Sequence, residues 1–282
     1  MKNAAYLPIA TLLLFAASVC ANASTTVGVV ISRVPYTISK PGDYRLSKDL
    51  VMTTASGSAI TITASNATLD LNGFTLSAAP AADIVGVFGI SIEAPHVTVR
   101  DGTIIGFGRC VNGYSGPEYD SQVVEDLTCE APVGNAGLYL FGADTFVTRV
   151  HVTNPTRALS APTGIYANYS SHIEDCSVSD LHAAAGSEAI AYELDDGPGD
   201  EAYTVLVRDS VASNLTADSG NVYGIIGGAK NTIVDHCYFF NLTSAGGPTG
   251  NGSVMIKDSV FRSCGASPLA GVTDGGGNIN EP

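Results

Sequence analysis

The densest group of chemically useful side chains in the 282-residue chain is the acidic segment ELDDGPGDE at positions 193–201. Carboxylate oxygens are ligands that Ca²⁺ prefers, and the candidate ligands are Glu193, Asp195, Asp196 and Asp200. Asp195 and Asp196 could also act as an acid and a base across a glycosidic bond, if a loop turns both to one side. The Gly-Pro-Gly that follows permits such a loop. The alternative is a solvated acidic loop without chemistry, and the spacing is not that of an EF-hand.

A second set of polar residues recurs at equivalent positions of short β-rich phrases. It holds Asp175, Asp209, His236 and Asp258. A row of carboxylates could carry chemistry, but Asp is also typical of tight corners between strands, where its short side chain bonds backbone groups. We therefore expect a structural corner ladder, with His236 as part of the scaffold.

Basic and aromatic residues add two further candidate groups. A basic side chain could abstract a proton next to a carboxylate in an elimination reaction, and the candidates are Arg208, Lys230 and Lys257. Each is more typical of an exposed surface position. Tyrosines near the small-aliphatic phrases could stack on sugar rings from one parallel sheet, or pack at its edge. These are Tyr139, Tyr166, Tyr192 and Tyr223.

The candidate residues lie in or next to a sequence repeat, which must position them in space. Phrases that alternate apolar and polar residues return every few tens of residues, as in FVTRVHVTN (146–154) and HIEDCSVSDL (172–181). This alternation predicts β-strands, and no window shows the spacing of an amphipathic helix. Smaller phrases such as GLYLFG (137–142) and GIYANY (164–169) lie between them. A repeat of about three short strands buries its apolar side by coiling and stacking on its neighbours, which predicts a β-solenoid.

The phrases ISKPGDYRLSKDL (38–50), AITITASNATLDLNGFTL (59–76) and GISIEAPHVTVRDGTIIGFG (89–108) resemble the start of a secreted protein of the pectin lyase-like group. The resemblance implies an all-β, single-stranded right-handed parallel β-helix over residues 24–282, with about eight rungs and an N-terminal cap at residues 27–50. Pectate lyases of this group use calcium to bridge enzyme and acidic sugar. The fold hosts many reactions, and the G-H-G, R-I-K and D-P-H-E phrases of related enzymes are absent from this sequence.

The first 23 residues are predicted to be a signal peptide. Lys2 precedes an apolar run at positions 7–17, which is shorter than the roughly 20 residues that span a bilayer. Ala21 and Ala23 give the A-x-A pattern of a cleavage site. No later stretch is apolar enough to cross a membrane, so we expect a secreted or periplasmic protein without a membrane span.

That compartment permits disulfides. Cys110 and Cys129 lie within one coil's length of each other and are the best candidates for a bridge. Cys176 and Cys237 fall in one column of the repeat, two rungs apart. Their separation, roughly 9 to 10 Å, is beyond the reach of a disulfide, so we expect them not to pair.

Composition narrows the function. With 13 basic and 27 acidic side chains, the formal net charge of −14 repels nucleic acid. The stacked strands of a solenoid form a long surface along which a linear polymer can bind. The sequence therefore predicts an exported β-helix that binds or processes polysaccharide, as a lyase or hydrolase, with Ca²⁺ as a candidate cofactor. The alternative is a non-catalytic β-helix that acts as a scaffold, an adhesin or a binding module.

Overall fold

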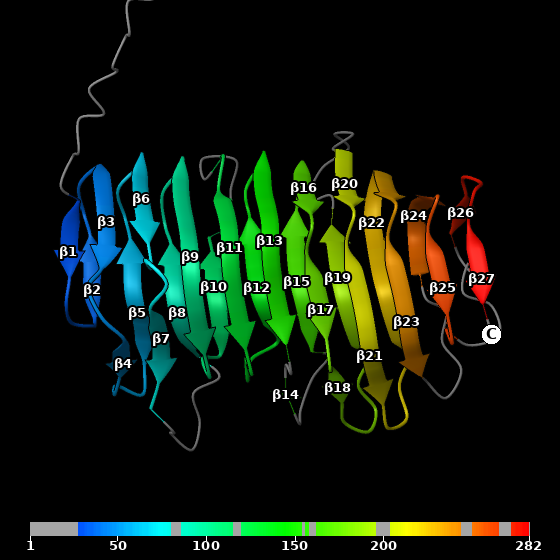
Figure 1. The fold of residues 1–282 in the computed structure, drawn as a ribbon, viewed down its shortest axis with the longest axis horizontal. Coiled ribbons are helices and arrows are strands. Elements are labelled where there is room, and N and C mark those ends of the chain that lie inside the picture. The colour runs from blue at the N-terminus through cyan, green and yellow to red at the C-terminus, as the bar shows by residue number, and fades with distance from the viewer. Residues whose placement is uncertain are drawn as a thin grey trace, which may run out of the picture.

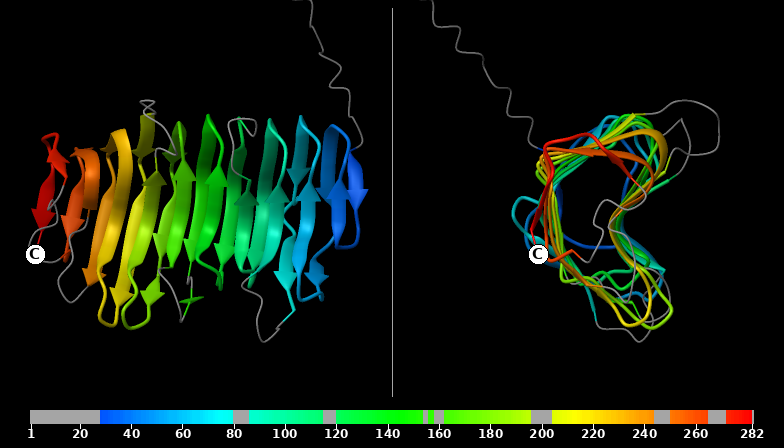
Figure 2. Two further views of the ribbon diagram at one scale, coloured as in Figure 1. Left: turned by 180° about the vertical axis from the view of Figure 1, so that it is seen from behind. Right: turned by 90° about the vertical axis from the view of Figure 1, so that its right-hand side faces the viewer.

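The computed structural model describes residues 28–79, 86–114, 120–153, 156–157, 162–195, 204–243, 250–264 and 272–281. Within these ranges every regular element is a β-strand, and the strand pairs are parallel. The strands lie side by side along the long axis of the molecule in chain order (Figure 1). Viewed down this axis, successive coils superimpose around one interior (Figure 2). The predicted fold class, an all-β right-handed parallel β-helix, is confirmed.

The strand pairs fall into three stacks, which we call sheets 1, 2 and 3. Sheet 1 contains β2 (Tyr36–Ile38), β5 (Gly57–Ile62), β8 (Val87–Ile92), β10 (Arg109–Gly113), β12 (Ala136–Phe141), β15 (Thr163–Asn168), β19 (Ala189–Asp195) and the first parts of β22 (Val222–Asp235) and β24 (Gly250–Lys257).

Sheet 2 follows along each coil. It contains β1 (Val29–Ile31), β3 (Gly42–Leu46), β6 (Ala67–Asp70), the first halves of β9 (Val97–Ile105), β11 (Val123–Glu130) and β13 (Thr145–Thr153), then β16 (Ser171–Glu174), β20 (Thr204–Arg208), the second parts of β22 and β24, and β26 (Thr273–Asp274).

Sheet 3 completes the coil. It contains β4 (Leu50–Met52), β7 (Thr75–Ala78), the second halves of β9, β11 and β13, then β17 (Ser177–Ser179), β21 (Val211–Ala217), β23 (Tyr238–Thr243), β25 (Val260–Arg262) and β27 (Ile279–Glu281). The short strands β14 (Thr156–Arg157) and β18 (His182–Ala183) pair beside its end.

The core consists of stacked files of like residues. In sheet 2 the register places one inward-facing aliphatic side chain of each coil on the next, and all are essentially inaccessible to water. This file runs through Leu69, Val99, Val124, Val147, Ile173, Val207, Val234 and Ile256. Each coil alone would expose its apolar side, so stacking supplies the burial that stabilises the fold.

The predicted corner ladder is confirmed. Its residue types are explained by their backbone conformation, and not by the side-chain bonds to backbone groups that we expected. Asp175, Asp209, His236 and Asp258 stack between sheets 2 and 3 with φ of 52°, 50°, 53° and 48°. One left-handed residue turns the chain from one sheet into the next, and short polar residues such as Asp tolerate that conformation better than most. The backbone N–H of Asp175 donates to the carbonyl of Arg208 on the next coil (3.2 Å). These residues are scaffold, as expected.

The cysteines follow the prediction. Cys110 and Cys129 form a disulfide, with Cα atoms 5.8 Å apart, that ties sheet 1 to sheet 3. Cys176, Cys237 and Cys264 are free and buried. The hydroxyl of Ser210 accepts a hydrogen bond from the backbone N–H of Cys176 (3.1 Å), which confirms that Cys and Ser stack in one column.

Two predictions concern the N-terminal part of the chain, the cap and the signal peptide. Residues 28–50 contain β1, β2, β3 and the first residue of β4; β1 stacks on β3 in sheet 2, and β2, β3 and β4 form the coil that pairs with β5, β6 and β7. Their role as a cap stays a prediction. The predicted signal peptide, residues 1–23, lies outside the described residues. In the described ranges, no helix has the length and hydropathy needed to cross a lipid bilayer.

Candidate functional site

The outer side of sheet 1 carries polar and aromatic side chains at matched positions. The register aligns Asn112, Tyr139, Tyr166 and Glu193 across β10, β12, β15 and β19. Residues two positions along a strand face the same way, which adds Phe141 and Asp195. We call this set, with two flanking residues, the sheet 1 face: Arg109, Asn112, Tyr139, Phe141, Thr163, Tyr166, Glu193 and Asp195.

Three rings of the sheet 1 face form an aromatic platform, in which Tyr139 and Phe141 are partly exposed and Tyr166 is buried beneath them. Tyr139 and Tyr166 are stacked, with centroids 4.5 Å apart and planes at 22°. The ring of Phe141 lies 4.7 Å from Tyr139 and 5.1 Å from Tyr166. The Arg109 guanidinium carbon lies 3.6 Å from the centroid of Tyr139, in cation–π contact. A hollow of about 230 Å³ lies against Arg109, Asn112, Tyr139 and Phe141.

Two carboxylates stand beside this platform. On β19, Glu193 Oε2 accepts a hydrogen bond from the Thr163 hydroxyl (2.9 Å), and Asp195 Oδ2 accepts one from the Tyr166 hydroxyl (3.1 Å). Both donors come from β15, the preceding strand of sheet 1. The Cα atoms of Glu193 and Asp195 are two residues of strand rise apart, about 6 to 7 Å. Both acidic side chains are therefore oriented by fixed donors on one face.

The two acids differ in environment. Partial burial raises the pKa of Glu193 above its ordinary value, and the negative charges of Asp195 and Glu188 add to the increase; the hydrogen bond from Thr163 opposes it. Burial also raises the pKa of the Tyr166 phenol, as does the neighbouring Asp195 carboxylate. Tyr166 therefore stays a neutral donor, and Glu193 retains its proton to a higher pH than a free glutamate. An acid with a raised pKa near a second carboxyl group is the arrangement needed for acid–base chemistry.

Only part of the predicted acidic site lies within the described residues. Asp196 and Asp200 lie outside the described residues, so the Asp195–Asp196 pair remains untested. The described partner of Asp195 on this face is Glu193, which the sequence suggested only as a metal ligand. Glu193 and Asp195 belong to no described group of three metal-ligating side chains. They provide at most part of the predicted calcium site.

The tyrosine prediction is confirmed in part. All four tyrosines belong to sheet 1, but Tyr192 points into the core, where its hydroxyl donates to the carbonyl of Val211 (2.8 Å). Tyr223 lies beside the face and hydrogen-bonds Asn221 (2.8 Å). The register explains the difference, because Tyr192 aligns with Ile165 and Glu193 with Tyr166.

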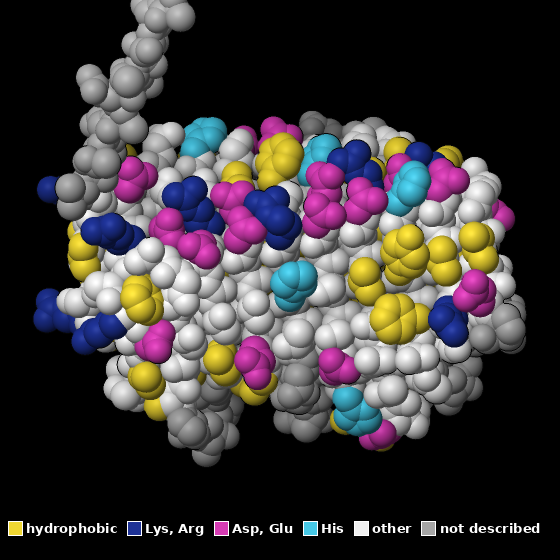
Figure 3. All heavy atoms as spheres, in the orientation of Figure 1, with side chains coloured by type: hydrophobic (Ala, Val, Ile, Leu, Met, Phe, Trp, Pro, Cys, Tyr) yellow, Lys and Arg dark blue, Asp and Glu magenta, His cyan; other side chains and the backbone are white. Residues whose placement is uncertain are grey.

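The proposed basic residues belong to a different surface. On sheet 2, Arg208 pairs with Glu174, and Lys257 Nζ lies 2.9 Å from Asp235 Oδ2. Acidic and basic side chains alternate in a band along the long axis (Figure 3). These ion pairs are partly exposed and contribute little individually. The side chain of Lys230 lies outside the described part of the chain.

Ligand atoms of Asp235, His236 and Asp258, in the same band, lie within 4.8 Å of one another. Lys257 already neutralises Asp235 and, with His236, lowers the pKa of that carboxyl despite its partial burial. An ammonium group within the cluster opposes the binding of a cation, and we assign no metal to it.

Comparisons with known proteins identify no family. No family model matches the chain, and no curated protein matches it. Among solved structures, a GH87 alpha-1,3-glucanase catalytic domain in complex with nigerose aligns at 11% identity and a TM-score of 0.43, over 89% of this chain and 64% of the glucanase chain. A structure of that domain with tetrasaccharides aligns at 14% identity and a TM-score of 0.24, over 86% and 64%. At this similarity, the activity of this chain must be inferred from its own residues.

Proposed function

We propose that the sheet 1 face binds a linear polysaccharide and hydrolyses a glycosidic bond. The observation that carries this proposal is the position of the Glu193 and Asp195 carboxylates beside the stacked rings of Tyr139 and Tyr166. Aromatic rings pack on the apolar faces of sugars, and paired carboxyl groups are the usual catalysts of glycoside hydrolysis. An exported parallel β-helix that processes polysaccharide, as in the pectin lyase-like group, is the function that these residues support best.

Each carboxyl group has a distinct role in this mechanism. Protonated Glu193 donates its proton to the glycosidic oxygen as the bond to the anomeric carbon breaks. Asp195 accepts a proton from a water molecule whose oxygen forms the new bond to that carbon. Tyr166 and Thr163 hold the two acids in place. Exchange of protons with solvent then restores the starting state.

The charge of the sheet 1 face favours a neutral sugar. Glu188, Glu193 and Asp195 are acidic, and the described cation closest to the platform, Arg109, is stacked on Tyr139. An anionic polymer would be repelled by these groups and by the net charge of −14. Hydrolysis of a neutral polymer therefore fits better than calcium-dependent elimination from an acidic one.

Export is part of the proposal. The Cys110–Cys129 disulfide is typical of an oxidising compartment, which agrees with the predicted signal peptide. Mass spectrometry of the secreted protein tests it, because cleavage after Ala23 leaves a chain that begins at Ser24.

A second candidate function is binding without catalysis. It is favoured by one observation, that both carboxylates already have hydrogen-bond partners within the protein. If these hydrogen bonds only stabilise the fold, the sheet 1 face can bind a polysaccharide but does not cleave it.

The experiment that separates the two incubates the protein with neutral glucans, xylan and galactomannan, and with uronate polymers, in calcium and in chelator. The proposal predicts new reducing ends from a neutral polymer, without calcium and without unsaturated products. Glu193→Gln and Asp195→Asn should each lower the rate at least about 100-fold. Glu130→Gln, on the exposed side of sheet 3, is the matched control and should retain the rate. Binding of a polymer without any cleavage would support the second candidate.

A further inference from the structure

A second concave site lies at the C-terminal end of the molecule, on the outer side of sheet 3. It is a groove of about 580 Å³ between β23, β25 and β27. Its lining residues are Tyr238, Phe239, Phe240, Asn241, Val260, Arg262, Ser263 and Glu281. Because these strands belong to sheet 3, the groove is separate from the sheet 1 face. We refer to it as the sheet 3 groove.

The sheet 3 groove presents two aromatic rings to solvent. Tyr238 is 53% exposed and Phe240 is 36% exposed, whereas Phe239 between them is buried and stacks on Phe261 (5.0 Å). Tyr238 and Phe240 are two positions apart on β23 and face the same way, and a contiguous exposed apolar patch of this kind often marks a binding site. The buried Phe239–Phe261 stack gives the groove a rigid floor.

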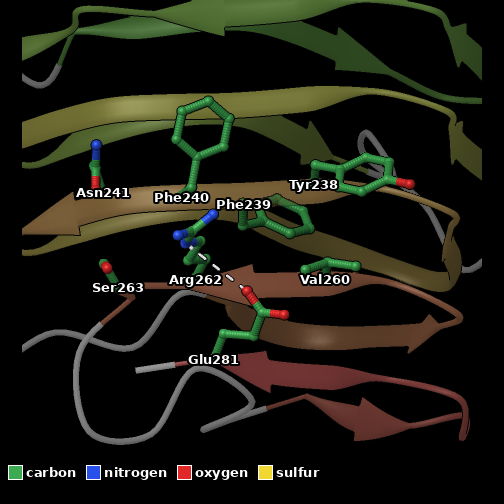
Figure 4. Close-up of a pocket in the computed structure, with 8 residues that line it drawn as sticks. All are labelled: Tyr238, Phe239, Phe240, Asn241, Val260, Arg262, Ser263 and Glu281. Atoms are coloured by element: carbon green, nitrogen blue, oxygen red, sulfur yellow. Dashed lines mark ion pairs between the residues drawn. The ribbon is translucent and has the colours of Figure 1, made fainter.

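Polar groups surround these rings. The register places Val260 beside Tyr238 and Arg262 beside Phe240, and Asn241 and Ser263 occupy the adjoining corner with positive φ. In Figure 4, Asn241 and Ser263 lie at one end of the groove and Tyr238 at the other. The Arg262 guanidinium lies 3.8 Å from the Glu281 carboxylate.

This ion pair makes the groove locally neutral. The Arg262 and Glu281 side chains are 70% and 50% exposed, so both can still reach a ligand. Together they offer several N–H donors and carboxylate acceptors without net charge. Such a lining fits a ligand that has an apolar face and many neutral hydroxyl groups, and it does not favour an ionic one.

We propose that the sheet 3 groove is a second, non-catalytic binding site for a neutral saccharide. Its rings stack on the C–H face of a sugar, while Arg262, Glu281 and Asn241 bond the hydroxyls. This inference takes only its ligand class from the proposed function, since it requires no reaction at Glu193. Its role is to anchor the polymer to the protein at a second point, separate from the sheet 1 face.

The pairing of the strands argues against an extended peptide as the ligand. β23 pairs with β21 and β25, and β25 pairs with β23 and β27, so the backbone at the centre of the groove is already hydrogen-bonded. A peptide could not extend the sheet there by adding a strand. Recognition must therefore occur through side chains, as it does for a sugar ring on an aromatic platform.

The test uses affinity electrophoresis of the full protein in gels that contain soluble α-glucan, mixed-linkage β-glucan, xylan or galactomannan. The wild-type protein should be retarded by at least one of these neutral polymers. A double variant, Tyr238→Ala with Phe240→Ala, should bind that polymer at least about tenfold more weakly. Phe146→Ala removes an aromatic ring that is 41% exposed on sheet 2 and should leave retardation unchanged.

The same variants separate this inference from the proposed function. Hydrolysis of a short oligosaccharide should survive the double substitution and be lost in Glu193→Gln, which should still be retarded by the polymer. If the wild-type protein is not retarded, or if the double variant, with an unchanged thermal midpoint, is retarded equally, the second site does not exist. If Phe146→Ala weakens binding as much as the double variant, the loss is not specific to the groove, and the inference fails. Retardation that depends on Tyr238 and Phe240 without any hydrolysis would support the groove and contradict catalysis.

Discussion

The hydroxyl of Thr163 donates a hydrogen bond of 2.9 Å to Glu193, the acidic residue whose pKa burial raises. Thr163 lies on β15 and Glu193 on β19, so the stacking of two coils creates the contact. This bond favours the ionised carboxylate and opposes the effect of burial. It therefore limits the rise in the pKa of Glu193 that burial and the charges of Asp195 and Glu188 cause.

Thr163→Val is expected to raise the pKa of Glu193 further, because it removes the bond that stabilises the charged form. If Glu193 acts as the protonated acid, the basic limb of the pH profile of kcat/KM should move to higher pH. Hydrolysis rates across a pH series measure this shift. A basic limb that stays in place or moves to lower pH would contradict the assignment of the acid.

The raised pKa of Glu193 also predicts how the stability of the protein depends on pH. Because the folded protein binds the Glu193 proton more tightly than the unfolded chain does, the free energy of unfolding should fall as pH rises from the unfolded pKa of glutamate through the raised folded pKa. Glu193→Gln should lessen this fall. Chemical denaturation of both proteins at several pH values tests the prediction, and identical slopes would count against a raised pKa.

Tyr139→Ala is expected to weaken substrate binding, because it removes a ring from the aromatic platform and the surface on which Arg109 stacks. KM should rise by about tenfold with a small change in kcat, since the ring binds the sugar without taking part in bond cleavage. Steady-state kinetics on a short oligosaccharide provide the measurement. An unchanged KM would show that the platform does not contact the substrate.

The corner ladder predicts opposite responses to two substitutions at one position. Asp175 has a φ of 52°, a conformation that glycine adopts freely and β-branched residues avoid. Asp175→Gly should leave the free energy of unfolding almost unchanged, whereas Asp175→Val should lower it by about 1 to 2 kcal/mol. Thr204→Val, at an exposed position of β20, is the control and should be neutral. Equal effects of glycine and valine at position 175 would refute the conformational explanation.

The Cys110–Cys129 disulfide closes a loop with a sequence separation of 19 residues. Replacing both cysteines by alanine should lower the free energy of unfolding by about 3 kcal/mol. A reductant should destabilise the wild-type protein but not this double variant. Cys176, Cys237 and Cys264 should react with a thiol reagent only after unfolding, because all three are buried. Rapid reaction in the native protein would contradict their burial.

The repeat made much of the architecture predictable. In a stacked coil, residues at equivalent positions of the repeat become neighbours in space, so aligning the phrases located the ladder of Asp175, Asp209 and Asp258. The same reasoning identified the Cys110–Cys129 bridge and kept Cys176 apart from Cys237. These features depend on spacing along the chain, which the sequence contains.

The candidate site was harder to predict because it depends on register within one strand. Aligning the small-aliphatic phrases by their first residues predicts that Ala189 continues the column of small residues that includes Gly137 and Gly164. In the structure Ala191 takes this place, beside Gly164 in sheet 1. A Cβ atom built on Gly137 would lie 2.6 Å from Val152 Cγ1 of sheet 3, so close packing requires a small residue there. This register places Tyr192 beside Ile165, in the core, and Glu193 beside Tyr166, on the sheet 1 face.

Side-chain contacts between coils could not be predicted from the sequence either. Arg109 and Tyr139 are far apart along the chain, and their stacking depends on the side-chain conformations of two neighbouring strands. The Thr163 hydroxyl carries no signal that distinguishes it from the many other threonines of the chain. Cross-coil hydrogen bonds of this kind follow from the register and could not be found by reading motifs.

The most direct test of the central claim is a crystal structure of the Glu193→Gln variant with an oligosaccharide of the polymer that the wild-type protein cleaves. We predict sugar rings packed on Tyr139 and Phe141, with a glycosidic oxygen within hydrogen-bonding distance of the side chain at position 193 and the anomeric carbon facing Asp195. An oligosaccharide bound elsewhere, with the sheet 1 face left bare, would contradict the account.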